Sequence, residues 1–474
     1  MIGSEPVVGN AVASRPESRR RVVILGGGFA GLHAARRLQR TLARQGDLEV
    51  VLISRENYVL FTPMLHEVAA GDLDPADIVI PLRKMLRRVR VIQGEVTDLD
   101  LQARVVRYAV GVLRQPRELT YDHLLLAMGS ETNYFGMKQL EAAAVTMKTL
   151  GDAALLRNRM VALLEEAAQE TDESRRRRLM TFVVAGGGFA GVETVGAIND
   201  FLRETLRYYP ELDQSMLRVV LIHPGKVVLP ELGERLGRYA QEKLQRRGLE
   251  LRLETQVTGY EDETVKVAPG DPIGAMSLIW TAGVMPAAAL GPLPVDKIKG
   301  RIKVNECLEV TGHEGVVWAV GDCAAVPDGR GGVHPPTAQH GMREALTAAK
   351  NIEAVVRAGA QKPFTFATIG QLASIGHRTG VAQILGMQFS GFVAWWLWRG
   401  VYLSKLPETS KKVRVAIKWS FDLLFPRDIE QLVTLRDVER VEELGATLRA
   451  MREAAVPVGS AASLPSQQQA DKRP

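Results

Sequence analysis

The sequence predicts an α/β protein with two Rossmann-like dinucleotide-binding domains, one inserted in the other, followed by a C-terminal helical region. The hexapeptide Gly-Gly-Gly-Phe-Ala-Gly occurs at 26–31 and again at 186–191, each time after a short apolar run and before a helix-like stretch. Such a strand, glycine turn and helix open a βαβ unit whose backbone approaches a pyrophosphate closely. The helix N-terminus then presents free N–H groups to the phosphates. Two such units predict two dinucleotides, with electron transfer between them.

The length, net charge and cysteine and histidine content limit which partners and cofactors are expected. The chain has 474 residues, enough for about three domains, and a formal net charge of +6. This mild surplus favours an anionic membrane surface or anionic cofactors, and since no nucleic-acid-reading motif accompanies it, we expect no nucleic-acid partner. Cys307 and Cys323 form no CxxC pair, which argues against a disulfide framework and a dithiol relay. The eight histidines show no metal-ligand spacing, so no metal site is expected.

The order of the elements nests the second unit inside the first. Residues 21–53 predict a strand, a helix and a strand, and the pattern repeats over 181–222. The chain then returns to the first domain, because 315–322 reads as a buried strand that ends in Gly-Asp and is followed by a helix to about residue 357. We therefore expect one domain to be inserted in the other.

Four further segments carry local predictions. The stretches 127–133 and 281–284 resemble turns close to a ligand. A helix is expected over 152–170, and the arginine run 175–178 is expected to be a solvated loop.

The C-terminal region is rich in tryptophan and in basic residues. The Trp-rich segment 389–403 is too short for a membrane-spanning helix, which needs about 20 apolar residues. At helical spacing one face of the next segment is apolar and another is mostly basic: Val413, Ile417, Phe421 and Leu424 against Lys411, Arg414, Lys418 and Asp422. The pattern predicts helices lying in the membrane interface, with lysines attracting anionic lipid. A helix pair packed on the protein's own core or on a dimer partner would show the same pattern.

With these blocks in place, the sequence resembles the type II NADH dehydrogenases, the single-subunit, non-proton-pumping NADH:quinone oxidoreductases. The resemblance covers about residues 20–435. Besides the two glycine turns it rests on FTPMLHEVA (61–69), LLAMGS (125–130), Gly191-Val-Glu193, AVGDC (319–323), Ala338-Gln339 and LASIG (372–376).

The resemblance implies an activity and a location. Hydride from NADH would pass to flavin N5, and two electrons would then reduce a membrane quinone without proton pumping. The protein would be a homodimer, bound peripherally to the cytoplasmic face of a bacterial inner membrane. The implied segments are a disordered N-terminus (1–20), a FAD-binding domain in two parts (21–150 and 286–365), an NAD(P)H-binding domain (151–285), a membrane-binding or dimer region (366–450) and a disordered tail (451–474).

The resemblance also assigns site residues. Those expected at FAD are Gly26, Gly28, Phe29, Ala30, Gly31, Ser54, Arg55, Gly129, Asp322, Ala338 and Gln339. Those expected at NADH are Gly186, Gly188, Phe189, Ala190, Gly191, Glu193, His223 and Gly283. Glu193, near nicotinamide and flavin, and Gln339, in the quinone pocket wall, are the expected catalytic residues. The helix that opens near 337–339 would stabilise negative charge on a reduced flavin.

Some positions depart from the family's pattern. Ser54 stands where an acid usually binds the FAD ribose, with Glu56 two residues away. His223 stands where an acid would bind the NADH ribose and repel a 2′-phosphate, so we expect NADPH to be tolerated. Glu344 replaces a usual Gln and Ile369 a usual Lys near the quinone, which leaves the quinone type open.

Three other functions compete with this one. A sulfide:quinone oxidoreductase would need cysteines flanking the flavin, and only Cys323 is placed for that. A membrane-associated flavoprotein could instead use NADH for redox sensing or for a protein interaction. A soluble disulfide reductase would need a dithiol, which the sequence lacks.

Overall fold

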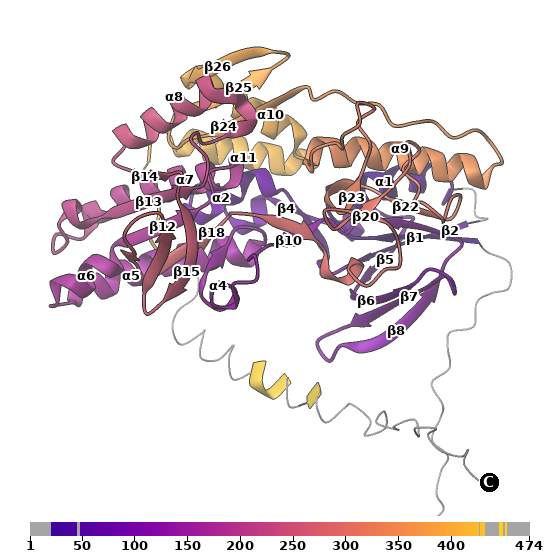
Figure 1. Ribbon diagram of the computed structural model, residues 1–474, viewed down its shortest axis with the longest axis horizontal. Coiled ribbons are helices and arrows are strands. Elements are labelled where there is room, and N and C mark those ends of the chain that lie inside the picture. Colours follow the sequence, from indigo (N-terminus) through magenta and orange to yellow (C-terminus); the bar gives the residue numbers. More distant parts are fainter. Residues whose placement is uncertain (1–19, 45–47, 426, 432–444, 449–450, 453–474) are drawn as a thin grey trace, which may run out of the picture.

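The protein is described by a computed structural model that covers residues 20–44, 48–425, 427–431, 445–448 and 451–452. Two parallel sheets with flanking helices form its two halves, which lie side by side (Figure 1). The predicted α/β class is therefore confirmed. The disorder predicted for the two ends of the chain concerns residues that lie outside this description, apart from Arg20, Met451 and Arg452.

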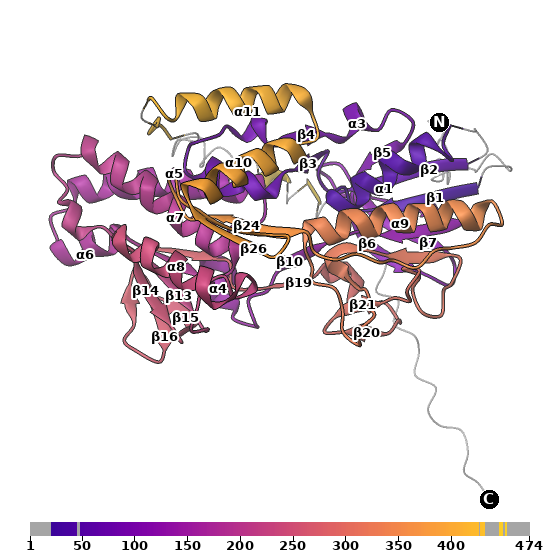
Figure 2. The ribbon, with the colours of Figure 1, turned by 90° about the horizontal axis from the view of Figure 1, so that it is seen from above.

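The first sheet begins with the first glycine turn's strand and is parallel throughout. Across the sheet the strands are β22 (Val317–Ala319), β9 (His123–Leu126), β1 (Arg20–Leu25), β2 (Leu48–Ser54) and β5 (Arg90–Gln93). Val22 to Leu25 are fully buried, as expected of a parallel strand covered on both faces. Helices α1 (Phe29–Arg40) and α9 (Ala338–Val356) lie side by side against this sheet (Figures 1 and 2).

The second sheet repeats this arrangement around the second glycine turn. Across the sheet the strands are β11 (Val145–Thr146), β18 (Ser277–Trp280), β12 (Thr181–Ala185), β13 (Arg218–His223) and β14 (Glu250–Leu253). Its helices are α5 (Leu150–Gln169), α7 (Phe189–Thr205) and α8 (Gly233–Arg246). The chain thus leaves the first sheet after β9 and rejoins it at β22. The two crossing segments pair with each other as antiparallel strands β10 (Ser130–Thr132) and β19 (Val284–Pro286).

Smaller elements complete the two halves. The strands are β3 (Tyr58–Leu60), β4 (Val79–Pro81), β6 (Glu95–Asp100), β7 (Val105–Val110), β8 (Gln115–Thr120), β15 (Gln256–Glu261), β16 (Thr264–Ala268), β17 (Ile273–Gly274), β20 (Lys297–Ile298), β21 (Arg301–Lys303) and β23 (Ala324–Ala325). The helices are α2 (Leu65–Ala69), α3 (Leu82–Met85) and α4 (Lys138–Ala143).

The arginine run 175–178, predicted to be a loop, is helical. It lies in α6 (Glu173–Leu179). Asp172 caps the helix by accepting hydrogen bonds from the backbone N–H of Ser174 at 2.8 Å and of Arg175 at 3.3 Å. Arg177 pairs with Glu173 one turn earlier. A capping acid and an i,i+4 ion pair stabilise a short helix, and the prediction considered neither.

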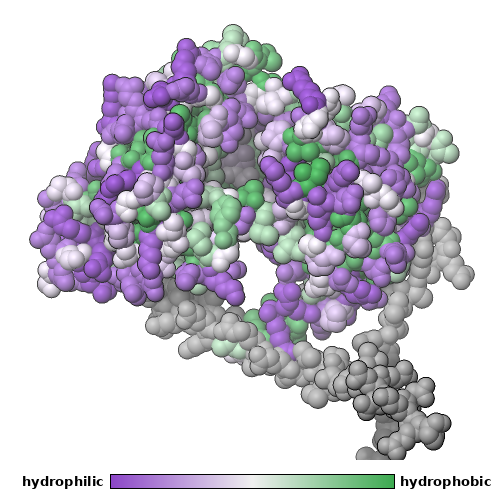
Figure 3. Space-filling view, in the orientation of Figure 1, coloured by the Kyte–Doolittle hydropathy of each residue, from purple (hydrophilic) through white to green (hydrophobic). Residues whose placement is uncertain are grey.

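The C-terminal region combines a small sheet with two helices. The antiparallel strands β24 (Gly370–Ser374), β25 (Gly380–Ile384) and β26 (Met387–Gly391) were not predicted. Helices α10 (Phe392–Lys405) and α11 (Thr409–Phe421) follow them. In Figure 3 most of the visible face is hydrophilic, and apolar residues gather at its top, where Figure 1 has β26.

Helix α11 lies with its basic side toward the protein. Val415 and Trp419 are buried in the core of the second half, whereas Val413, Ile417 and Phe421 are at least half exposed. Lys418 binds Asp74 and Asp77, and Arg414 approaches Asp77 at 3.4 Å. Acidic side chains of the protein thus pair with Arg414 and Lys418, and Lys411 donates to the carbonyl of Ala76. That this basic side attracts anionic lipid stays a prediction. None of the helices in the described ranges is both long enough and apolar enough to cross a bilayer.

Candidate functional site

The first glycine turn forms a cradle at the carboxyl end of β1. Gly26 has a φ of +103°, and a side chain on it would collide with the carbonyl of Ala127. A side chain on Gly31 would collide with the carbonyl of Gly26, which lets α1 pack against the strand. Gly28, by contrast, faces open space at the N-terminus of α1. The turn therefore needs glycine at two positions for its own shape, and at Gly28 it leaves room for a ligand.

This cradle opens into a cavity of about 800 Å³. Of the residues expected at FAD, those that line it are Gly26, Gly28, Phe29, Ala30, Ser54, Arg55, Gly129, Asp322 and Ala338. Gly31 and Gln339 do not line it. Glu56, proposed as a substitute for Ser54, does. The cavity has the volume, the N-termini of α1 and α9 and the charged lining residues that suit a dinucleotide.

Lys148 lines the same cavity and was not predicted. Its ammonium donates to the hydroxyl of Ser130 at 3.1 Å, and that hydroxyl donates to Asp322 Oδ2 at 2.7 Å. Burial lowers the pKa of Lys148, and Asp322 opposes the shift. Lys148 carries no motif signal, since it simply precedes Thr149, the N-cap of α5. It supplies a cation inside a site built for an anionic ligand.

Glu344, on α9, holds the Gly321–Asp322 turn through a hydrogen bond to its backbone. Its Oε2 accepts the backbone N–H of Gly321 at 2.7 Å, and the side chain is buried. Burial raises the pKa of Glu344 to about 7. The residue was expected beside the quinone, and the structure places it behind the Asp322 edge of the cavity.

The N-terminus of α9 reaches the cavity, but the Gln339 side chain does not. Thr337 and Ala338 line the cavity, so the first N–H groups of α9 point toward it. Gln339 instead donates through Nε2 to the carbonyl of Gly370 at 3.2 Å. It thereby ties α9 to β24 in the C-terminal region. Ile369 lies next to this contact and is 46% exposed.

The second glycine turn has the same local geometry as the first. Gly186 has a φ of +111°, and a side chain there would press on Thr281 and Ala282. A side chain on Gly191 would collide with the carbonyl of Gly186, whereas Gly188 faces open space. The N-terminal residues of α7, Phe189 and Ala190, follow directly, and Gly283 lies against Phe135 near the same sheet edge.

His223 ends β13 beside this turn. Its Nδ1 accepts the backbone N–H of Gly187 at 3.1 Å, and burial lowers its pKa. The ring is therefore neutral at pH 7. The nearby Lys226 is exposed, with its ammonium 4.0 Å from Glu254. His223 thus offers neither the carboxylate that selects a ribose 2′-hydroxyl nor a charge that attracts a 2′-phosphate.

Glu193 joins the second half to the C-terminal region. Its Oε1 accepts the backbone N–H of Ser374 at 3.1 Å and the indole N–H of Trp398 at 2.9 Å. His66 Nδ1 lies 3.9 Å from its other oxygen. Burial raises the pKa of Glu193 to about 8 and lowers that of His66 to about 3. Both groups are neutral at pH 7, so this contact is not an ion pair.

A second buried carboxyl repeats this pattern with α11. Glu67 Oε2 accepts the indole N–H of Trp419 at 3.0 Å, and burial raises its pKa to about 8. The guanidinium of Arg399 lies over the rings of Trp395 and Trp419, at 4.1 and 4.7 Å from their centroids. Each C-terminal helix is therefore held by one indole–carboxyl hydrogen bond. The sequence block 61–69 contained both His66 and Glu67 but gave no indication of these partners.

Comparison with known proteins gives consistent matches over nearly all the described chain. Residues 20–350 match the family model described as pyridine nucleotide-disulphide oxidoreductase, and residues 369–428 match the NDH2 C-terminal domain. The chain is 33% identical to the type II NADH:quinone oxidoreductase Ndh of Mycobacterium tuberculosis, over 89% of this chain and 92% of that one. It is 34% identical to NdhA of the same organism, over 86% and 87%.

A solved structure shares the fold. The NDH2 of Plasmodium falciparum, determined in complex with NADH, superposes with a TM-score of 0.80 over 87% of this chain and 100% of that chain, at 19% identity.

Proposed function

The chain belongs to the type II NADH:quinone oxidoreductases, within the pyridine nucleotide-disulphide oxidoreductases, and from this membership we propose that it sets NADH against FAD between its two halves. The observation that carries the proposal is the pair of identical glycine turns, each with its middle glycine facing open space at a helix N-terminus. The first turn opens on a cavity large enough for a dinucleotide.

We assign FAD to the first turn. Gly28 leaves room for the pyrophosphate, Asp322 accepts hydrogen bonds along the cavity, and Lys148 supplies a positive charge there. The N-terminus of α9 adds a partial positive charge of about half a unit. When bound, FAD supplies the two-electron carrier between NADH and quinone.

We assign NADH to the second turn. Gly186, Gly188 and Gly191 shape it, and His223 stands where a selective acid would stand. The neutral ring neither repels nor attracts a 2′-phosphate, so NADPH should be tolerated. A preference for NADH above about a hundredfold in kcat/KM, which is about 2.7 kcal/mol, would contradict this assignment.

Glu193 acts as a neutral carboxyl that can donate or hold a proton near the reacting rings. Its raised pKa of about 8 lies close to neutral pH, which suits proton exchange. Quinone reduction consumes two protons, so a protonated buried carboxyl has a direct use. We place the quinone beside the C-terminal region, where Gln339 and Glu193 both hydrogen-bond to β24.

The exposed apolar side chains of α10 and α11 support peripheral binding to the cytoplasmic face of a bacterial inner membrane. On α10 they are Phe392, Val393 and Trp396, and around α11 they are Val413, Ile417, Phe421 and Leu424. Apolar groups of this size, presented by helices too short to span, suit the membrane interface. Quinone would then enter from the lipid. A homodimer, as the resemblance implies, would share part of this region.

The competing functions have less support. Cys323 is fully buried in the core of the first half, and its thiol contacts the carbonyl of Val320 at 3.3 Å, so it has no access to sulfide. A sensing role would not require a quinone site.

Stopped-flow spectroscopy of the purified, lipid-supplemented protein tests the proposal. NADH should bleach the flavin absorbance, and a quinone should restore it within one turnover. Rapid multiple turnover would exclude a purely sensing role. A protein that stays colourless after addition of FAD, or whose bound flavin NADH never bleaches, would overturn the proposal.

A further inference from the structure

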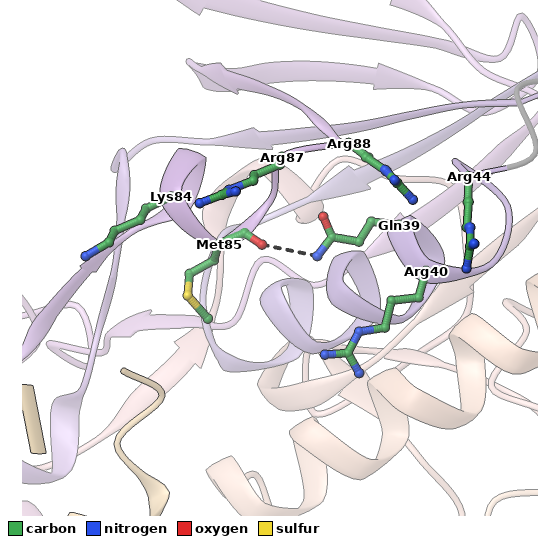
Figure 4. A pocket seen from close by; sticks show the side chains of 7 residues that line it. All are labelled: Gln39, Arg40, Arg44, Lys84, Met85, Arg87 and Arg88. Atoms are coloured by element: carbon green, nitrogen blue, oxygen red, sulfur yellow. Dashed lines mark hydrogen bonds between the residues drawn. The ribbon is translucent and has the colours of Figure 1, made fainter. Parts of the chain in front are cut away.

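A basic groove lies between the C-terminal end of α1 and the segment that begins with α3. Figure 4 shows it from close by. We name it the arginine groove, and it is lined by Gln39, Arg40, Arg44, Lys84, Met85, Arg87 and Arg88. Its volume is about 340 Å³. The amide of Gln39 donates to the carbonyl of Met85 at 3.1 Å and so fixes the two walls to each other.

The positive charges of the four arginines in the arginine groove are not balanced by nearby carboxylates of the described residues. No carboxylate lines it. Among the described residues, the side chains of Arg40, Arg44, Arg87 and Arg88 have no acidic partner within ion-pair distance, and all four are exposed. Arginines at the far end of the molecule differ, since Arg175 and Arg177 of α6 both pair with glutamates. A guanidinium presents a planar fork of donors that matches a phosphate oxygen pair, so four unused forks around one cavity fit a phosphate ligand.

The groove adjoins the helix whose apolar side faces outward. Lys84 forms an ion pair with Glu408, the residue that precedes α11. In Figure 2, α3 and α11 lie along the same edge of the molecule. Two of the four cations of α11, Arg414 and Lys418, pair with Asp74 or Asp77, and the other two, Lys411 and Lys412, donate to backbone carbonyls. The arginine groove therefore adds four arginines, without a carboxylate partner among the described residues, to the edge of the molecule along which α11 lies.

We propose that the arginine groove binds the phosphate headgroup of an anionic phospholipid while α11 lies in the membrane interface. The proposal rests on the membrane docking put forward above. A lipid fits better than a nucleic acid, because the groove adjoins the start of α11 through Lys84 and Glu408, and α11 presents exposed apolar side chains that a lipid surface would cover. Near an anionic membrane each cation strengthens binding by about fivefold.

Vesicle sedimentation at low salt tests the proposal with two variants of equal charge. One is Arg44→Gln/Arg87→Gln/Arg88→Gln, and the matched control is Arg175→Gln/Arg177→Gln/Arg178→Gln on α6; each removes three positive charges. Vesicles contain phosphatidylcholine alone or with about a third of phosphatidylglycerol. The groove variant should lose on the order of a hundredfold in partitioning onto the anionic vesicles, and bind the neutral ones as wild type does. The α6 control should stay within about threefold of wild type, because α6 lies at the opposite end of the molecule from α3 (Figure 2).

Two further readouts keep the outcome clear. All the substituted side chains are solvent-facing, so the melting temperature and the reduction of a soluble short-chain quinone by NADH should match wild type. The single variant Arg88→Gln should lose about fivefold on anionic vesicles, which guards against a folding defect in the triple variant.

Each contrary result has a distinct meaning. If wild type binds neither kind of vesicle, both the membrane docking and the groove proposal fail. If wild type prefers anionic vesicles and the groove variant does so equally, the groove proposal alone fails. If the groove variant loses binding to a single-stranded DNA oligonucleotide but keeps its vesicle binding, the groove serves nucleic acid and the lipid proposal is overturned. If wild type binds inorganic phosphate in a calorimetric titration and the groove variant does not, yet both prefer anionic vesicles equally, the ligand is a free anion and not a lipid.

Discussion

Replacing Glu193 by glutamine should stabilise the protein at alkaline pH relative to wild type. The carboxyl is 8% exposed and accepts two hydrogen bonds through one oxygen. Glutamine keeps the size and that acceptor but carries no charge. Burial raises the pKa of Glu193 from 4.5 to about 8, so the wild-type protein must release a buried proton as the pH approaches 8.

The magnitude follows from the shift. Between pH 4.5 and about 8 the unfolded chain has lost this proton and the folded protein has kept it. The contribution of protonated Glu193 to stability is thus fully present below pH 4.5 and is lost as pH rises through about 8, at about 1.4 kcal/mol per pH unit. From pH 5 to pH 8 this is on the order of 4 kcal/mol. Proteins unfold with an entropy of about 2.1 cal/mol/K per residue. If all 474 residues unfold together, a loss of about 4 kcal/mol corresponds to a fall of about 4 °C in the melting temperature.

Thermal unfolding of wild type and Glu193→Gln at pH 5, 6, 7 and 8, at constant ionic strength, measures this effect. The variant's melting temperature should rise relative to wild type by about 4 °C across that range. Glu141→Gln, on the exposed side of α4, is the matched control and should track wild type at every pH. All other titrating groups are common to the proteins and cancel in the difference. The reasoning is refuted if the melting temperature of Glu193→Gln minus that of wild type stays constant or falls between pH 5 and pH 8.

Four other changes test separate parts of the site. Trp398→Phe removes one of the two donors to Glu193, so the limb of the kcat/KM profile near pH 8 should move up by about one unit. Gly28→Ala and wild type should melt alike once both are freed of flavin, because the added methyl group meets no protein atom, yet the variant should retain little flavin after desalting, read from the visible absorbance. His223→Glu should raise the ratio of kcat/KM for NADH over NADPH at least about tenfold, since a carboxylate repels the 2′-phosphate. Ile417→Asp should weaken sedimentation with neutral vesicles by at least about tenfold, because it puts a charge on the exposed apolar side of α11.

Much of the fold could be read from local sequence. The two hexapeptides predicted two strand–turn–helix units, and both are present with nearly identical glycine contacts. These predictions succeed because a glycine with positive φ, or one pressed against a carbonyl, depends only on its close neighbours. The prediction of a loop at α6 is wrong although the signals for a helix are local: charge alone favours a solvated loop for the run of arginines, whereas Asp172 caps a helix there.

The parts that were not predicted depend on contacts between distant segments. Lys148 reaches the cavity only because β10 and the start of α5 lie beside it. Trp398 and Glu193 are separated by 205 positions along the chain, and their hydrogen bond exists only once the C-terminal region packs on the second half. The orientation of α11 shows the same limit. Its sequence defines one apolar and one basic side, but only the position of Asp74 and Asp77 decides which side faces the protein.

The two indole–carboxyl hydrogen bonds link attachment of the last helices to the protonation of buried acids. Trp398 holds α10 to Glu193 and Trp419 holds α11 to Glu67, and burial raises the pKa of both carboxyls to about 8. An indole N–H can donate to a neutral carboxyl, but the one donor at Glu67 and the two at Glu193 compensate poorly for a full buried charge. Arg399 stands beside Glu67 and lowers its pKa, whereas the neutral His66 gives Glu193 no such help. Since burial outweighs this difference and leaves both pKa values at about 8, both helices should loosen as the pH rises through that value. Hydrogen exchange of α10 and α11, corrected for the intrinsic rise of exchange with pH, should quicken in both helices between pH 7 and pH 9, and protection that stays constant across pH 8 would contradict this account.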